Sequence, residues 1–176
     1  ADLTADVLHQ AADGLARAFD AERGGLLSGS TNKFPPSMAM DVMLRSAMRR
    51  PATDAQRQKL IDLVTLTLDE MADGGIYDQL GGGIHRYSTD PDWHVPHFEK
   101  MLYDQALVSR IYLDAYQLTG RKLYARIARE IFDYVIGDLQ SPQGGFYSTR
   151  DADSEGEEGK YYVWTRTQIA DAVGED

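Results

Sequence analysis

The chain has 176 residues, of which 43% are hydrophobic, and this is enough to bury the core of one globular domain. Its formal net charge is -10 and its basic residues are scattered, which argues against duplex nucleic acid and anionic membranes as partners, because both require a basic surface. The lack of cysteine excludes a disulfide framework or a thiolate site within this sequence.

The first three helices are predicted from their apolar spacing. One is expected over 4–19, with Thr4 as its N-cap, and it is amphipathic. The second, over about 35–50, has apolar residues around most of its circumference. Thr53 and Gln56 form a capping-box pattern in front of the third, which is apolar on one side only.

Two further long helices and the start of another follow along the chain. The fourth is expected over about 97–118 and is apolar on nearly every face, whereas the fifth, over 121–139, is amphipathic. Thr165 and Gln168 form a second capping-box pattern. Amphipathic and all-round apolar helices therefore alternate.

The same order of segments repeats along the chain. A Gly-Gly-apolar triplet follows each amphipathic helix and precedes a long loop and then an apolar helix; the triplets stand at 24–26, 74–76 and 144–146. Apolar helices belong inside and one-sided helices outside, so we predict an all-α fold of two concentric layers, an (α/α) toroid with its long loops at one end. A simple bundle or solenoid of helical hairpins is the alternative, although such long loops are unusual there and are often functional.

The long loops are rich in aromatic and acidic residues. Aromatic faces mixed with carboxylates suit a polyhydroxylated ligand such as a sugar. The plainer interpretation is that the aromatic side chains plug the mouth of the toroid and that the acids are solvated. The aromatic residues are Tyr77, Tyr87, Trp93, Phe146, Tyr147, Tyr161, Tyr162 and Trp164.

The segment WHVPHFEKMLYD, residues 93–104, is the most concentrated polar motif. If the fourth helix begins at His97, then His97, Lys100 and Asp104 share one helical face, and Glu99 and Tyr103 share another. An imidazole near a carboxylate is a workable general acid/base set. The alternative is a helix N-terminus that is held by a local ion pair between Lys100 and Asp104.

Two metal sites are conceivable from the sequence, and neither is favoured. His94-x-x-His97-x-Glu99 offers ligands for zinc, but its spacing is not that of a zinc-protease motif. The acidic loop 151–156 resembles the first half of an EF-hand calcium loop, yet Tyr162 occupies the twelfth position, where a glutamate belongs. We therefore expect neither a metal nor an organic cofactor.

Two long strings carry a family resemblance: GGIYDQLGGGIHRYSTDPDWHVPHFEKMLYDQA and GGFYSTRDADSEGEEGKYYVWT. From about Lys33 onward the chain resembles the YyaL-like family, also called the spermatogenesis-associated thioredoxin-domain proteins. Lys33-Phe34-Pro35 matches the end of a Gly-Ala-Pro-Lys-Phe-Pro motif of that family, whereas the preceding LLSGSTN departs from it.

The resemblance implies a thioredoxin-like domain followed by an (α/α)6 toroid similar to N-acylglucosamine 2-epimerase, cellobiose epimerase and the six-hairpin glycosidases. Residues 1–176 would form roughly the first half of that toroid, without its remainder and without the thioredoxin-like domain. A start without methionine and an end in VGED suggest the same. The related epimerases use histidine bases, several of which lie in the later half, so the resemblance transfers no catalytic role.

Candidate site residues are nominated because they match the motifs of the family. The candidate catalytic residues are His97, Glu99, Tyr103 and Asp104. The candidate substrate-binding residues are Asp78, His85, Arg86, Trp93, Asp151 and Asp153.

The leading functional hypothesis is part of a carbohydrate-active or carbohydrate-binding toroid, with epimerase-like, isomerase-like or glycosidase-like proton transfer in the full-length protein. One alternative is a non-catalytic scaffold that accompanies a thioredoxin-like redox domain; another is a thiol-redox accessory whose chemistry lies outside this chain. Expected partners are a sugar-like small molecule and the rest of the same chain. Exposed inner helices predict self-association, and the expected compartment is the cytoplasm.

Overall fold

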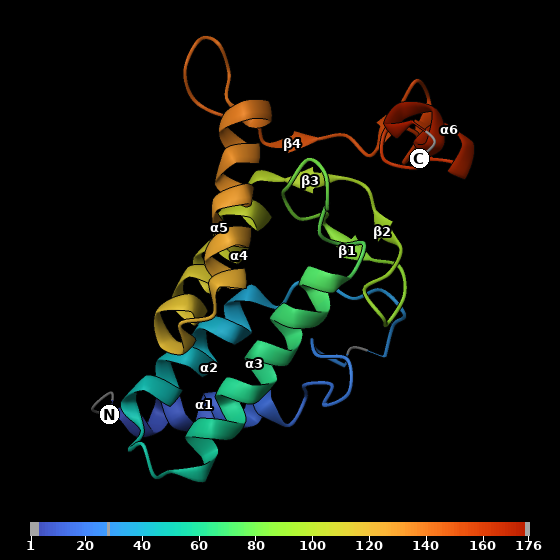
Figure 1. The fold of residues 1–176 in the computed structure, drawn as a ribbon. Helices are drawn as coiled ribbons and strands as arrows, with labels where there is room; N and C mark the ends of the chain where they lie inside the picture. The colour runs from blue at the N-terminus through green and yellow to red at the C-terminus, as the bar shows by residue number, and fades with distance from the viewer. Residues whose placement is uncertain (1–3, 28, 175–176) are drawn as a thin grey trace.

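The structure is a computed structural model that describes residues 4–27 and 29–174; Ser28, within the LLSGSTN stretch, and the last two residues of VGED lie outside this description. Figure 1 shows helices joined by loops that contain only two-residue strands. The helices are α1 (Ala5–Ala16), α2 (Ser37–Arg49), α3 (Ala55–Asp73), α4 (Leu102–Thr119), α5 (Lys122–Tyr134), the π-helical turn η1 (Val135–Leu139) and α6 (Arg166–Val173). The strands are β1 (Tyr87–Ser88), β2 (Pro96–His97), β3 (Lys100–Met101), β4 (Thr149–Arg150), β5 (Asp153–Ser154) and β6 (Glu157–Glu158).

The first five helices form two layers of helical hairpins. Helix α2 packs against α1, α3 and α4, while α4 packs against α5 (Figure 1). The core lies between these layers and includes Met40, Met43, Leu60, Val64, Leu68, Met71, Tyr112 and Ile127, which are all fully buried. The apolar helices α2 and α4 thus form the inner layer, and the one-sided helices form the outer layer, as their patterns predict.

Two helix starts differ from the sequence prediction. The N-cap of α3 is Asp54, whose carboxylate accepts a hydrogen bond from the Gln56 backbone N–H at 2.8 Å. The Gln56 side chain instead donates to Asp13 on α1, so the predicted Thr53–Gln56 capping box is wrong. The capping box at Thr165, in front of α6, is confirmed.

The fourth helix begins at Leu102 rather than at 97, because the preceding segment is extended and pairs with an earlier part of its own loop and with the loop after α5. Strand β2 pairs with β1, and β3 pairs with β4, both antiparallel. These pairings bring the 84–101 loop together with the loop that follows α5. The predicted helical face of His97, Lys100 and Asp104 is therefore wrong, since His97 and Lys100 lie on strands.

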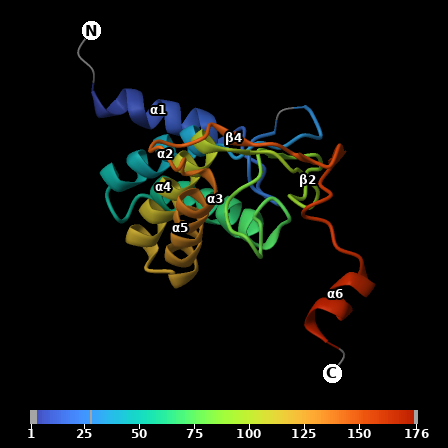
Figure 2. The same cartoon turned by 90° about the horizontal axis from the view of Figure 1, so that it is seen from above.

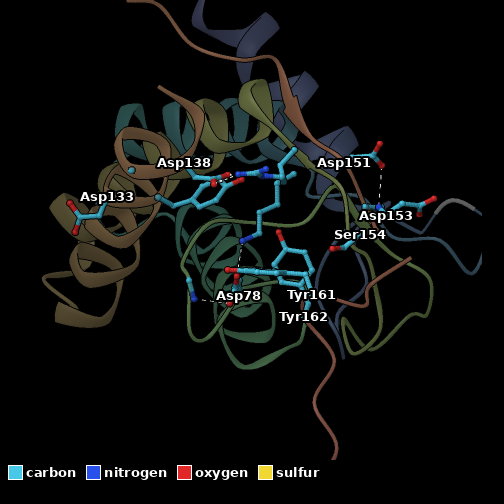
Figure 3. Close-up of a pocket in the computed structure, with 14 residues that line it drawn as sticks. Asp78, Asp133, Asp138, Asp151, Asp153, Ser154, Tyr161 and Tyr162 are labelled. Atoms are coloured by element: carbon cyan, nitrogen blue, oxygen red, sulfur yellow. Dashed lines mark hydrogen bonds and ion pairs between the residues drawn. The ribbon is translucent and has the colours of Figure 1, made fainter. Parts of the chain in front are cut away.

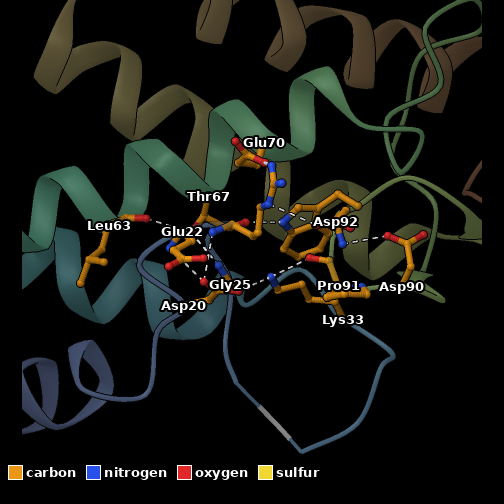
Figure 4. Close-up of polar contacts among 12 residues, drawn as sticks. Asp20, Glu22, Gly25, Lys33, Leu63, Thr67, Glu70, Asp90, Pro91 and Asp92 are labelled. Atoms are coloured by element: carbon orange, nitrogen blue, oxygen red, sulfur yellow. Dashed lines mark hydrogen bonds and ion pairs between the residues drawn. The ribbon is translucent and has the colours of Figure 1, made fainter.

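A glycine turn after α1 is fixed by an aspartate and a buried lysine (Figure 4). The backbone carbonyl of Asp20 accepts a hydrogen bond from the Gly24 N–H at 3.1 Å, and the backbone N–H of Asp20 donates to Gly25 O at 2.8 Å. Lys33 Nζ lies 3.0 Å from Asp20 Oδ2 and donates to Pro91 O at 2.9 Å. Since Pro91 belongs to the loop after α3, this lysine joins two successive long loops.

The same device recurs in the loop after α3. The backbone carbonyl of Asp78 accepts a hydrogen bond from the Gly82 N–H at 3.0 Å, and the backbone N–H of Asp78 donates to Gly83 O at 3.1 Å. Lys100 Nζ lies 2.7 Å from Asp78 Oδ2 and donates to Gly82 O at 2.8 Å. Its strand, β3, pairs with β4 at Arg150 in the next loop. The chain therefore repeats a turn, a lysine and a strand that reaches forward.

The repeat runs through a different glycine pair from the one that the sequence suggests. The turn equivalent to Gly24-Gly25 is Gly82-Gly83, and all four glycines have positive φ. Gly74 and Gly75 instead allow backbone contact: a Cβ there would lie 2.4 Å from Trp93 O and 2.1 Å from His94 O, respectively. Glycine is favoured both where φ is positive and where the backbone packs closely, so a Gly-Gly pair in the sequence does not show which of the two it serves.

Helix α6 stands away from the other helices in both views (Figures 1 and 2). None of its residues is buried. Within the described residues, no helix is both long and apolar enough to span a membrane.

The close approach at Gly75 leads to a stability prediction. We expect Gly75→Ala to lower the free energy of unfolding by at least about 2 kcal/mol, because the added methyl would overlap the His94 carbonyl. Gly14→Ala in α1 is the matched control: its Cβ would come no closer than 3.7 Å to Arg17, and alanine favours helix by up to ~1 kcal/mol. Urea denaturation of both variants measures the difference, and equal stability would contradict the contact.

Candidate functional site

The extended segment that leads into α4 sends its side chains to two opposite sides. Successive residues of a strand point to opposite faces. His97 and Glu99 lie on one side, where the His97 Nε2 atom is 3.7 Å from Glu99 Oε2. Phe98 and Lys100 lie on the other, where the Phe98 and Tyr162 rings stack at 5.6 Å and Lys100 reaches Asp78. WHVPHFEKMLYD therefore contributes to two separate places.

The first place is a charged group that we call the Arg86 cluster: Arg86, His97, Glu99 and Asp104. Arg86 Nη1 donates to Glu99 Oε2 at 2.7 Å. The His97 Nδ1 atom lies 2.6 Å from Glu158 Oε1 on β6. Strands β1 and β2, the entrance of α4 and the β5–β6 hairpin thus converge here.

Asp104 is the unusual member of this cluster. It lies in the first turn of α4 and only 7% of its surface is exposed. Burial raises the pKa of its carboxyl from 3.8 to about 7, the Glu99 carboxylate adds to the increase, and the Arg86 guanidinium opposes it. Its Oδ2 atom is buried and has no hydrogen-bond partner, and the same holds for Arg86 Nε.

This arrangement can transfer a proton near neutral pH. A carboxyl whose pKa is about 7 is present in both protonation states, which suits a general acid or base. The guanidinium of Arg86 stays charged, because its bond to Glu99 raises its pKa further. A carboxyl that exchanges protons therefore lies near a permanent cation that can stabilise a developing oxyanion. Tyr103, half-exposed, lies close enough to contribute to the raised pKa of Arg86.

The second place is a cavity of about 490 Å³ on the Lys100 side, which we call the tyrosine pocket (Figure 3). It lies among the end of α5, η1 and the segment 150–162. Lys100, 1% exposed, forms part of its wall, with its Nζ atom 4.2 Å from the Tyr134 ring centre and 5.0 Å from that of Tyr162. The other lining residues are Asp78, Gly81, Asp133, Gly137, Asp138, Arg150, Asp151, Ala152, Asp153, Ser154 and Tyr161.

The ten nominated residues divide among three environments. The four candidate catalytic residues and Arg86 gather in or beside the Arg86 cluster. Asp151 and Asp153 line the tyrosine pocket, and so does Asp78, although its carboxylate is held by Lys100. His85 and Trp93 are enclosed by other side chains.

Trp93 and His85 occupy structural positions. Trp93 is fully buried, donates its Nε1–H to Arg23 O at 2.8 Å and has a positive φ of 62°. His85 is enclosed by the rings of Phe98 and Tyr162, and burial, helped by the Lys100 charge, lowers its pKa to about 4. His85 is therefore neutral at physiological pH, and both side chains hold the loops together.

The sequence does not predict the positions of several residues that form the two places. Lys100 was placed on a helix with Asp104, whereas it pairs with Asp78. Tyr134 and the pair of Arg150 with Asp138 carried no local signal, because their partners lie on different segments. A search for buried polar atoms without partners would have found Tyr134, but only in three dimensions.

The two conceivable metal sites do not assemble. Among the described residues, no group of three or more histidine, aspartate or glutamate side chains is placed to hold a metal ion. His97 contacts Glu158, and Asp151 accepts a hydrogen bond from the Asp153 backbone within its own loop.

Comparison of the sequence identifies longer relatives. No protein-family model matches the chain. Spermatogenesis-associated protein 20 of Mus musculus is 42% identical over 168 residues, which cover 92% of this chain and 21% of that protein. The human protein gives the same identity and coverage. The chain thus spans about a fifth of the length of the curated relatives that it matches.

Comparison of the structure identifies sugar-epimerase folds. A sugar epimerase from a ruminal bacterium superposes with a TM-score of 0.67 at 15% identity, over 85% of this chain and 40% of that one. Cellobiose 2-epimerase from Spirochaeta thermophila gives 0.67 at 15% identity, over 83% and 39%. The predicted fold class, part of an (α/α) toroid, is therefore confirmed. The comparisons likewise confirm the resemblance to the spermatogenesis-associated proteins, so that the chain is similar to about a fifth of such a protein.

Proposed function

We propose that the Arg86 cluster is part of a carbohydrate site in which Asp104 exchanges a proton with a bound sugar. One observation carries the proposal: Asp104 Oδ2 and Arg86 Nε are both buried without a partner, in a cluster where the carboxyl has a pKa of about 7. Unsatisfied buried polar atoms destabilise a fold, so their retention at one place suggests a use.

The reaction class follows from what this pair can do. The ionised Asp104 would accept a proton from the sugar carbon beside a carbonyl, while the electron pair of that C–H bond moves to form an enolate. The charge of Arg86 would stabilise the enolate oxygen. Delivery of a proton to the opposite face of the same carbon, as the enolate collapses back to the carbonyl, completes an epimerisation. Delivery to the former carbonyl carbon, while the proton of the neighbouring hydroxyl moves to the enolate oxygen, completes an isomerisation; neither route needs an oxidant. The similar structures named sugar epimerase and cellobiose 2-epimerase support this class.

Access to the two atoms requires a local movement. Both are covered in the structure, and Tyr103, 49% exposed and adjacent to Asp104 in the chain, is the side chain that would turn aside. The hydrogen bond between His97 and Glu158 holds the β5–β6 hairpin beside the cluster, so a bound sugar would also contact this hairpin.

The buried side chains that hold the loops together support the alternative of a non-catalytic scaffold. Trp93 and His85 hold loops together, and the buried lysines serve the same purpose. In that interpretation the Arg86 cluster is one more structural contact, and sugars have no effect on the protein.

We also propose that the chain forms the first half of a toroid whose remainder, together with a thioredoxin-like domain, belongs to the full-length protein. The coverage of relatives and of epimerase structures supports this division. The cytoplasm is the compartment that we propose from the sequence.

The exposed aromatic and aliphatic side chains after the tyrosine pocket lead to a prediction about association. Tyr161, Val163, Trp164 and Ile169 are each at least 49% exposed. We expect the 176-residue chain alone to self-associate through them, because exposed apolar side chains promote contacts between molecules. Sedimentation velocity at increasing concentration measures this, and a monodisperse monomer would contradict it.

The burial of Asp104 gives a pH-dependent prediction. In the unfolded chain its carboxyl ionises near 3.8, but in the folded protein it ionises at about 7. Stability from this group is therefore lost as pH rises between these values, at a cost of up to ~4 kcal/mol, because one pKa unit corresponds to about 1.4 kcal/mol. Asp104→Asn should be more stable than wild type above pH 7 and gain nothing at pH 4.

Urea denaturation at several pH values tests this expectation. Asp171→Asn, at an exposed position on α6, controls for the removal of a charge. A difference between Asp104→Asn and wild type that does not change with pH would contradict the assignment.

The carbohydrate proposal predicts binding and proton exchange. In the full-length protein, titration with cellobiose or mannose should raise the melting temperature, and the sugar C2 proton should exchange in D2O, as followed by NMR. We expect Asp104→Asn to abolish exchange and Arg86→Gln to reduce it at least 100-fold, since the oxyanion loses its donor.

Arg121→Gln is the matched control, because Arg121 pairs with Asp69 on the outer helices, away from the cluster. Exchange that continues in Asp104→Asn would refute the role of Asp104. No response to any sugar, with variants that only change stability, would favour the scaffold.

A further inference from the structure

We propose that the tyrosine pocket binds a small organic cation, a molecule with a protonated amine, at a site distinct from the Arg86 cluster. The pocket lies on the opposite side of the extended segment and shares none of its lining residues with that cluster. Its volume of about 490 Å³ suits a small molecule.

The charge of the lining is strongly negative. Five aspartates, one lysine and one arginine line the pocket. Lys100 pairs with Asp78, and Arg150 pairs with Asp138. The remaining carboxylates have no ion-pair partner among the described residues; they are Asp133, Asp151 and Asp153. Three negative charges are therefore uncompensated, which favours a cationic ligand.

Acidic residues lie on both sides of the pocket, and Asp133, Asp151 and Asp153 are exposed at its edges. Figure 3 shows Asp133 and Asp138 on one side of the pocket and Asp151 and Asp153 on the other, with Tyr161 and Tyr162 below them. Asp133 comes from α5, whereas Asp153 comes from β5. A ligand in the pocket would thus meet carboxylates from two separate elements.

A buried hydroxyl points independently to a ligand. Tyr134 is 9% exposed and lines the pocket, and its hydroxyl is buried without a hydrogen-bond partner. Burial raises the pKa of Tyr134, and the nearby Asp138 carboxylate, which is paired with Arg150, adds to this increase. The phenol oxygen can accept a hydrogen bond from an ammonium group.

The aromatic walls are suited to an ammonium group. Lys100 Nζ already lies over the rings of Tyr134 and Tyr162, which shows that ring faces here tolerate a cation. An organic cation fits better than a metal ion, because no three carboxylate or imidazole side chains among the described residues converge. Tyr161, largely exposed at the rim, offers a further ring face to a ligand.

Calorimetric titration with 1,4-diaminobutane tests the proposal, and 1,4-butanediol is the neutral control of the same length. We expect saturable binding of the diamine, at least tenfold weaker binding of the diol, and an affinity that falls as salt is added. The combined Asp133→Asn and Asp153→Asn variant should weaken binding at least tenfold, whereas Asp171→Asn should leave it unchanged.

Tyr134→Phe separates a ligand role from a structural one. If the hydroxyl serves a ligand, the variant should bind the diamine several-fold more weakly and keep or raise its melting temperature. A lower melting temperature with unchanged binding would overturn the proposal, as would equal binding of diamine and diol or no binding at all. Asp104→Asn should leave diamine binding unchanged, so failure of the carbohydrate proposal would be recognised separately.

Discussion

The buried lysine–aspartate pair is the interaction on which the loop end depends. Lys33 with Asp20, and Lys100 with Asp78, each fasten a glycine turn to an extended residue that pairs with the next long loop. Removal of one partner of such a pair would leave a buried charge, at a cost of about 3–5 kcal/mol. Because Lys100 must point toward its aspartate, strand alternation directs Glu99 to the opposite side. One ion pair thereby positions both candidate sites.

The sequence predicts the helices well, because their apolar spacing is a local property. The alternation of the outer helices α1, α3 and α5 with the inner helices α2 and α4 follows from that spacing. The start of α4 does not. Residues 97–101 also fit a helical pattern, but β2 pairs with β1 in the same loop, and β3 pairs with β4, which lies far away in the chain. Pairing partners at such distances override local helical preference, and the sequence contains no sign of them.

For the same reason, the sequence predicts which residues belong to the candidate site but not the environments that the fold gives them. His97, Glu99 and Asp104 stand in one conspicuous motif, yet the property that makes Asp104 useful is its burial near Arg86, which lies in an earlier part of the loop. Tyr134 lies at the end of an amphipathic helix, where the sequence pattern predicts an ordinary core residue. Its environment depends on the segment 150–162 folding over it.

The positions of the unsatisfied atoms separate structural polar groups from functional ones. The lysines and aspartates that hold the loops are fully bonded, and so are the buried side chains of Trp93 and Gln105. Within the described residues, the buried side-chain polar atoms without a partner are Arg86 Nε, Asp104 Oδ2 and Tyr134 Oη. Two lie in the Arg86 cluster and one in the wall of the tyrosine pocket, and none is among the interhelical contacts of the core. A scaffold selected for stability alone would have satisfied or replaced them, so their placement on the two sides of one strand favours ligands at both.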